Sequence, residues 1–141
     1  MTGDTAIDTI TLSAAAVQSA ALWIALHLLL LVFLSARVVS LRRRHRVGIG
    51  DGGVDDLALG VRAFGNAAEY AGPGLVAILA LAAVGAPLLL NVVGATLFAG
   101  RLAHALGLSR SSGLSVGRTV GMVLTYTAYI VAAASLLFYA F

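Results

Sequence analysis

The chain has 141 residues, the length of one ordinary domain. Its residues are 60% hydrophobic and only 11% charged, and its mean hydropathy is +1.00, which excludes a soluble globular domain and indicates a membrane protein. The sequence pI is about 10.0, but the basic side chains, all arginine, cluster beside apolar stretches, and this distribution argues against nucleic acid as a partner. The absence of cysteine excludes disulfides and a protein-derived thiol nucleophile.

Four apolar stretches separated by short breaks containing Gly, Pro or Arg follow one another along the chain. Each is long enough to cross a bilayer, which takes about 20 residues per helix. The sequence therefore predicts an all-α membrane protein built as a four transmembrane helix bundle. We place the spans at about 14–40, 56–84, 88–106 and 117–141, so that residues 1–141 form a single domain. The second span is interrupted near Gly72, Pro73 and Gly74, where we expect a kink because proline removes one backbone hydrogen bond.

Charged residues between the spans predict the orientation of the chain. The N-terminal segment carries Asp4 and Asp8 but no basic residue, so it lacks the positive region of a cleavable signal peptide. The first span ends at Arg37 and at the run RRRHR of residues 42–46. Cytoplasmic loops are enriched in arginine, so we expect the first and third loops in the cytoplasm and both termini outside.

Polar side chains inside the second span form the densest candidate site. Arg62, Asn66 and Glu69 are spaced by four and three residues, which at about 100° per residue places them on one stripe, with Tyr70 beside it. Charges within a membrane helix cost roughly 2.5–3.5 kcal/mol each, so they usually face partners or water. A guanidinium, an amide and a carboxylate together suit a zwitterionic, peptide-like ligand. An ion-pair network that only fixes helix packing fits the same spacing.

Further candidates lie in the third and fourth spans. Arg101 and His104 are one turn apart on one face, and His104 suits either a proton carrier or a hydrogen-bonded packing residue. Arg118 and Thr119 lie at the start of the fourth span, where backbone amides favour an anion or a thiolate. Arg118 could instead extend to the lipid headgroups. Paired histidines with metal-ligand spacing are absent from the sequence, so we expect no metal site.

Three segments, RRRHRVGIGDGG, RAFGNAAEY and GRLAHALGL, resemble the MAPEG family, the membrane-associated proteins in eicosanoid and glutathione metabolism. The resemblance covers about residues 37–118 and is closest to the small bacterial members. It implies a four-helix subunit in the bacterial inner (plasma) membrane, assembled as a homotrimer, with glutathione bound between adjacent subunits near the cytoplasmic face. Partners would be the lipid bilayer, glutathione as co-substrate, a lipophilic small molecule and further copies of the chain.

The resemblance also implies roles for individual residues. Arg118 matches the arginine thought to stabilise the glutathione thiolate and is the predicted catalytic residue. The family usually carries tyrosines where this chain has His104 and Leu108, a departure that bears on thiol handling. The predicted glutathione-binding residues, taken from the resemblance and from the polar residues above, are Arg42, Arg43, Arg62, Asn66, Glu69, Tyr70, Arg101, His104 and Thr119.

These expectations support a glutathione transferase or peroxidase-like enzyme, in which a thiolate stabilised by a cationic pocket attacks an apolar electrophile arriving from the lipid. A glutathione-binding or scaffold protein without catalysis is the alternative, favoured by the missing tyrosines. A third hypothesis is a small proton-coupled transporter that uses Glu69, the one glutamate of the chain.

Overall fold

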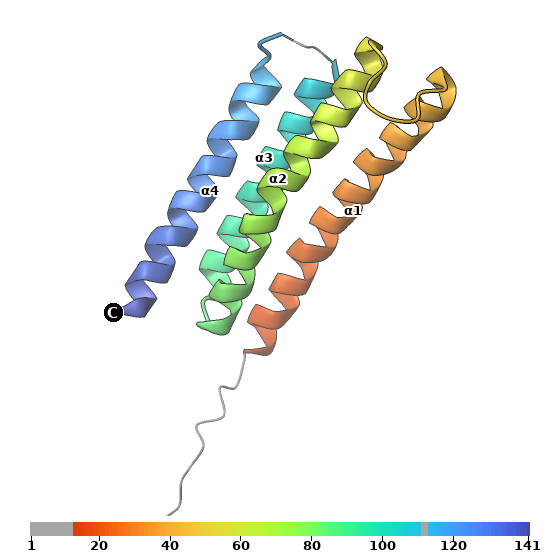
Figure 1. Ribbon diagram of the computed structural model, residues 1–141. Coiled ribbons are helices and arrows are strands. Elements are labelled where there is room, and N and C mark those ends of the chain that lie inside the picture. The colour runs from red at the N-terminus through yellow and green to blue at the C-terminus, as the bar shows by residue number, and fades with distance from the viewer. Residues whose placement is uncertain (1–12, 111–112) are drawn as a thin grey trace, which may run out of the picture.

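The computed structural model describes residues 13–110 and 113–141, so that Asp4 and Asp8 lie outside the described residues (Figure 1). Four helices account for most of this region: α1 (Ala14–His45), α2 (Asp55–Ala83), α3 (Pro87–Arg110) and α4 (Val116–Ala140). All four are long and apolar enough to cross a membrane. The predicted all-α architecture with four long apolar helices is thereby confirmed, and it is consistent with a four-helix membrane bundle.

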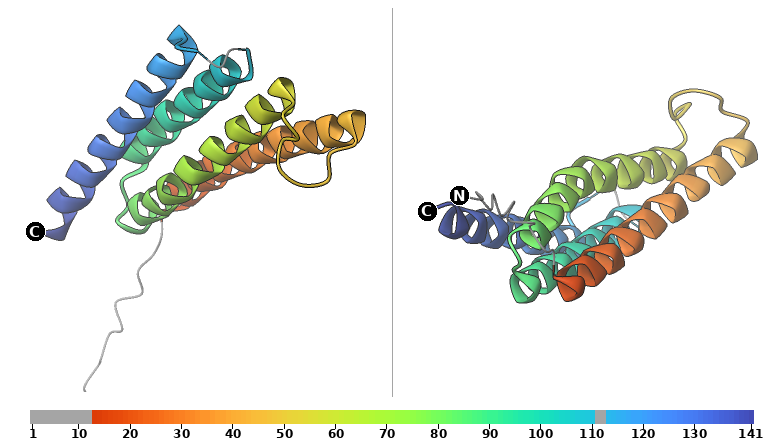
Figure 2. Two further views of the ribbon diagram at one scale, coloured as in Figure 1. Left: turned by 45° about the horizontal axis from the view of Figure 1, so that its top comes forward. Right: turned by 90° about the horizontal axis from the view of Figure 1, so that it is seen from below.

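The helices are arranged as an open bundle. Successive helices run antiparallel, and α2 and α3 occupy the middle (Figures 1 and 2). α1 packs against α2 and α3, whereas α4 packs mainly against α3 and to a smaller extent against α2. Within the described part of the chain α1 and α4 do not touch. Both helices therefore remain largely exposed in the single chain, and their exposed large apolar side chains include Phe33 and Phe138.

α1 continues beyond the predicted end of its span through the arginine run to His45. Basic side chains in a last turn are favourable because that end of a helix carries partial negative charge. Arg46 then adopts a left-handed conformation with φ 56° and ends the helix. His45 Nε2 lies 3.1 Å from Asp56 Oδ2, which ties the end of α1 to the start of α2.

α2 runs through Pro73 without interruption, so the predicted interruption of the helix at 72–74 is wrong, whereas the kink at this place stays a prediction. Neighbouring helices in a membrane can compensate for the backbone hydrogen bond that proline removes. Gly74 allows such close packing, because a Cβ at this position would lie 2.2 Å from Cδ2 of Leu97 on α3.

The contact between α3 and α4 is made by glycine backbones. A Cβ added to Gly121 would lie 2.6 Å from the carbonyl oxygen of Gly100, and one added to Gly107 would lie 2.7 Å from the backbone nitrogen of Arg118. Small residues permit such close approach of membrane helices. The glycines thereby set the position of Arg118, at the start of α4, relative to α3.

Candidate functional site

A buried arginine joins three helices in the middle of the structure. Arg101 on α3 is only 1% exposed. Its Nη1 donates to Asn66 Oδ1 on α2 at 2.8 Å, and its Nε and Nη2 donate to Thr125 Oγ1 on α4 at 2.9 and 2.6 Å. Hydrogen bonds from a charged donor are stronger than neutral ones, so these contacts hold α2, α3 and α4 together.

Tyrosine rings complete the surroundings of this cation. The guanidinium carbon of Arg101 lies 4.8 Å from the centroid of the Tyr70 ring, within the range of a cation–π interaction. Tyr129 on α4 donates its hydroxyl hydrogen to the backbone oxygen of Tyr70 at 2.5 Å. We call Asn66, Tyr70, Arg101, Thr125 and Tyr129 the polar cluster. Among the described residues Arg101 forms no ion pair, so its positive charge is balanced by neutral dipoles and ring electrons alone.

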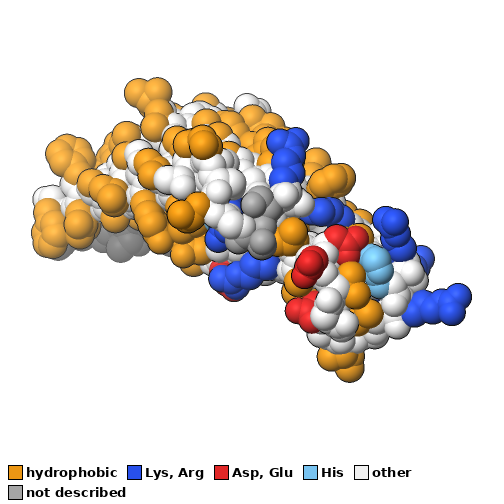
Figure 3. All heavy atoms as spheres, turned by 90° about the horizontal axis from the view of Figure 1, so that it is seen from above, with side chains coloured by type: hydrophobic (Ala, Val, Ile, Leu, Met, Phe, Trp, Pro, Cys, Tyr) orange, Lys and Arg blue, Asp and Glu red, His pale blue; other side chains and the backbone are white. Residues whose placement is uncertain are grey.

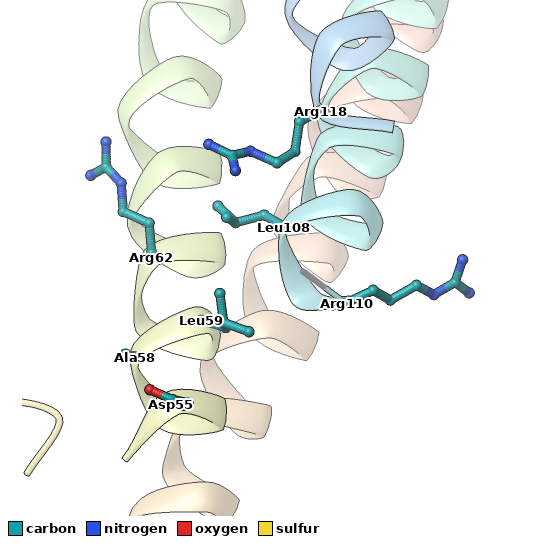
Figure 4. A pocket seen from close by; sticks show the side chains of 7 residues that line it. All are labelled: Asp55, Ala58, Leu59, Arg62, Leu108, Arg110 and Arg118. Carbon is teal, nitrogen blue, oxygen red and sulfur yellow. The ribbon is translucent and has the colours of Figure 1, made fainter. Parts of the chain in front are cut away.

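A cleft of about 640 Å³ opens between α2 and the α3–α4 hairpin (Figure 4). It lies at the end of the bundle where α3 ends and α4 begins, which we call the loop end. Arg118 extends across it from α4 toward α2, where Arg62 stands on the opposite side, whereas Arg110 points away. Arg118 Nη1 also donates to the backbone oxygen of Gly113 at 2.5 Å. The complete lining consists of Asp55, Ala58, Leu59, Arg62, Leu108, Arg110 and Arg118. The two arginines that face the cleft, Arg62 and Arg118, against the one carboxylate of Asp55 make this cleft suited to an anionic ligand.

Arg62 and Glu69 form an ion pair on the outer side of α2. Arg62 Nη1 lies 3.3 Å from Glu69 Oε1, and the two side chains are 63% and 54% exposed. Both border a second hollow of about 460 Å³ next to the α1–α2 loop, so Arg62 separates this hollow from the cleft. The predicted stripe is therefore divided, because Asn66 is buried and turned toward Arg101 while Arg62 and Glu69 face outward.

The remaining predicted residues lie in other places. His104 is buried on α3, one turn from Arg101, and packs against Gly121. Thr119 is exposed and borders a separate groove that starts at Leu114. Arg42 and Arg43 line a groove of about 390 Å³ at the end of α1. Figure 3, a view onto the loop end of the molecule, shows the basic side chains spread over this end, with acidic groups close by.

The single chain thus brings Arg62 and Arg118 to one cleft, and Asn66, Tyr70 and Arg101 to one cluster. Arg42, Arg43 and Thr119 are not brought to either. Sequence reasoning missed Thr125 and the cluster role of Tyr129. Gly121, Thr125 and Tyr129 follow one another at intervals of four residues, a signal that could have placed all three on the α3-facing side of α4.

The fold and the site define a small helical membrane protein with a cationic cleft at one end and a buried arginine behind it. The chain belongs to the MAPEG family, whose sequence profile matches residues 20–138. It is similar to Inner membrane protein YecN of Escherichia coli strain K12, with 37% identity over 120 residues that cover 84% of this chain and 90% of that protein. Inner membrane protein YecN of E. coli O6:H1 strain CFT073 is similar to the same extent. The resemblance inferred from the three sequence segments is confirmed, and family membership suggests a glutathione-related membrane protein.

Proposed function

We propose that the protein is a glutathione-binding membrane enzyme, a transferase or a peroxidase-like reductase, that acts on lipophilic electrophiles. The observation that carries this proposal is the cleft in which Arg118 from α4 faces Arg62 from α2. Glutathione has two carboxylates for arginines, an ammonium group for Glu69 and peptide groups. Paired arginine and carboxylate hydrogen bonds are among the strong contacts available to such a ligand.

The chemistry follows from the charge of Arg118. Arginine stays protonated and cannot remove a proton at neutral pH, so its role is electrostatic. A positive charge next to sulfur favours the thiolate over the thiol, and the thiol proton passes to water. The thiolate then attacks an electrophilic carbon; a carbon–sulfur bond forms, and the displaced group leaves with the electron pair. With a hydroperoxide as the electrophile, sulfur attacks the terminal oxygen, the O–O bond breaks, and the alkoxide takes up a proton and leaves as the alcohol. The thiol of a second glutathione then displaces the hydroxyl of the resulting sulfenic acid as water, so that two glutathiones are oxidised to the disulfide while the peroxide is reduced.

A homotrimer is part of the proposal. Arg62 and Glu69 are more than half exposed in the single chain, although they lie on a helix that is apolar enough to span a membrane. Charged groups in such helices usually face protein or water rather than lipid. A neighbouring subunit against α2 would cover this pair and could supply its own Arg42 and Arg43 to the cleft. We further propose that the protein lies in a bacterial inner membrane with the loop end of the bundle facing the cytoplasm.

Calorimetric titration of the purified protein with glutathione tests the binding step. Glu69→Gln and Arg62→Ala should each weaken binding tenfold or more, because a hydrogen bond to a charged group is worth about 1.5–3 kcal/mol. Arg44→Ala, a change at an exposed arginine outside the cleft, should leave the affinity unchanged. If both site variants assemble normally and bind glutathione like the parent protein, the ion pair is structural and the site lies elsewhere.

Binding without catalysis is the second candidate, and two placements favour it. His104 is buried against α4 rather than lining the cleft, and Leu108 presents an apolar side chain to the cleft where the family usually has tyrosine. Glutathione binding without turnover of a chlorodinitrobenzene electrophile or an organic hydroperoxide would support this candidate over the enzyme.

A further inference from the structure

A further groove lies between α1 and α3 and has a volume of about 190 Å³. Its walls are almost entirely apolar and include Phe33, Leu102 and Leu106. Phe33 is 65% exposed, so the groove opens to the outside of the single chain. At the end closest to the loops it is closed by Arg37 and Ser109. It shares no lining residue with the Arg62–Arg118 cleft, so an inference about it does not rest on the proposed function.

Arg37 is the first charged residue of α1, after more than twenty uncharged positions. It therefore lies where the hydrocarbon core gives way to the headgroups, since about 20 residues cross that core. Its Nη1 donates to Ser109 Oγ and its Nη2 donates to the Ser109 backbone oxygen at 3.5 Å. A guanidinium has five N–H donors, so this anchored cation retains donors for a further acceptor.

We propose that this groove binds an anionic phospholipid, with one acyl chain along the apolar walls and the phosphate on Arg37. The length of the apolar walls and the positive charge at the end of α1 support this occupant. The walls from Leu30 to Arg37 extend about 10 Å along the helix axis, at about 1.5 Å per residue, and offer an extended methylene chain continuous apolar contact. The arginines at 42–44 and 46 make this end of α1 strongly basic, and such clusters attract anionic lipids.

The test uses the full chain purified in detergent, with dioleoyl phosphatidylglycerol and dioleoyl phosphatidylcholine added in turn. Native mass spectrometry counts retained lipids, and thermal unfolding measures stabilisation. We expect preferential retention of phosphatidylglycerol. Arg37→Gln should reduce this preference about fivefold, as expected from about 1 kcal/mol for one basic residue near anionic lipid. Phe33→Ala should weaken retention of both lipids.

Two matched variants separate the groove from general basic charge. Arg44→Gln removes an exposed arginine of the same helix end that does not line the groove, and it should reduce the preference clearly less than Arg37→Gln does. Ser109→Ala removes the side-chain anchor of Arg37 but keeps the cation, so the preference for phosphatidylglycerol should largely remain. A loss of preference in Arg37→Gln but not in Ser109→Ala therefore reports the missing charge and not a disturbed fold. The proposal is overturned if the parent protein shows no preference for phosphatidylglycerol, if Arg44→Gln loses as much as Arg37→Gln, or if a second copy of the chain fills the groove.

Discussion

The guanidinium carbon of Arg101 lies 4.8 Å from the centre of the Tyr70 ring, and the backbone oxygen of the same Tyr70 accepts a hydrogen bond from Tyr129. One residue of α2 is thereby joined to α3 through its ring and to α4 through its backbone. Burying an unpaired charge is costly unless hydrogen bonds satisfy it. The neutral partners around Arg101 are therefore central to the stability of the three-helix contact.

Arg101→Lys should destabilise the protein although the charge is retained. An ammonium group cannot reproduce the forked contact with Asn66 and Thr125, and each hydrogen bond to a charged group is worth about 1.5–3 kcal/mol. Thermal unfolding in detergent should show a lower midpoint for this variant. Arg110→Lys, at the exposed end of the same helix, is the control and should unfold like the parent protein. If the parent protein, Arg101→Lys and Arg110→Lys all unfold at the same temperature, the hydrogen bonds of Arg101 do not contribute to stability.

Gly121→Ala should weaken the contact between α3 and α4. The added methyl group would lie 2.6 Å from the Gly100 carbonyl oxygen and from the backbone nitrogen of His104, and backbone atoms cannot move aside as the end of a side chain can. The expected loss is about 1–3 kcal/mol, as for other overpacked positions. Gly65→Ala is the control, because its Cβ would approach nothing closer than Glu69 Oε1 at 4.0 Å. It should keep or slightly raise the stability, since alanine favours helices over glycine.

Arg118→Ala should raise the pKa of the thiol of bound glutathione. In the parent protein the thiol should titrate below its ordinary value of about 8.5, because the arginine favours the thiolate. Loss of the arginine moves the titration to higher pH, so turnover at neutral pH falls and recovers as the pH rises. The ultraviolet difference absorbance of the thiolate, measured against the protein without glutathione, follows this titration directly. At a pH well below the pKa of the bound thiol, each unit of pKa changes the thiolate fraction about tenfold. If the thiol titration and the activity are both unchanged in Arg118→Ala, Arg118 has no part in the chemistry and only extends to the lipid headgroups.

Orientation in the membrane is open to a direct measurement because the chain has no cysteine. Single cysteines at Ile49 in the α1–α2 loop and at Val84 in the α2–α3 turn are both accessible, since both positions are exposed. With arginine-rich loops in the cytoplasm, a membrane-impermeant maleimide added to intact spheroplasts should label the cysteine at 84 but not that at 49. The reverse pattern would place the Arg62–Arg118 cleft on the outer side.

The number and type of helices could be predicted because the bilayer imposes a minimum length on every apolar segment. The family could be identified because Arg62, Asn66, Glu69 and Tyr70 keep a fixed spacing within one helix. The rotation of α2 could not be predicted. Asn66 and Glu69 differ by about 60° on the helix surface, and the boundary between buried and exposed surface falls between them. Thr125 was missed because a hydroxyl in an apolar helix acquires its importance only when Arg101 of another helix reaches it.

The glycine contact between α3 and α4 has a mechanical consequence. Helices separated by side chains can shift against each other when those side chains change rotamer. The backbones of α3 and α4 are in direct contact, so these two helices are expected to move together as one hairpin. α1 and α2 form the other hairpin, and the turn at Gly85, with φ 70°, connects the two. The polar cluster bridges the hairpins at mid-height and acts as a pivot between them. Movement of the hairpins that widens the cleft at the loop end therefore strains the hydrogen bonds of Arg101 to Asn66 and Thr125, so that a side chain only 1% exposed bears on how readily a ligand enters.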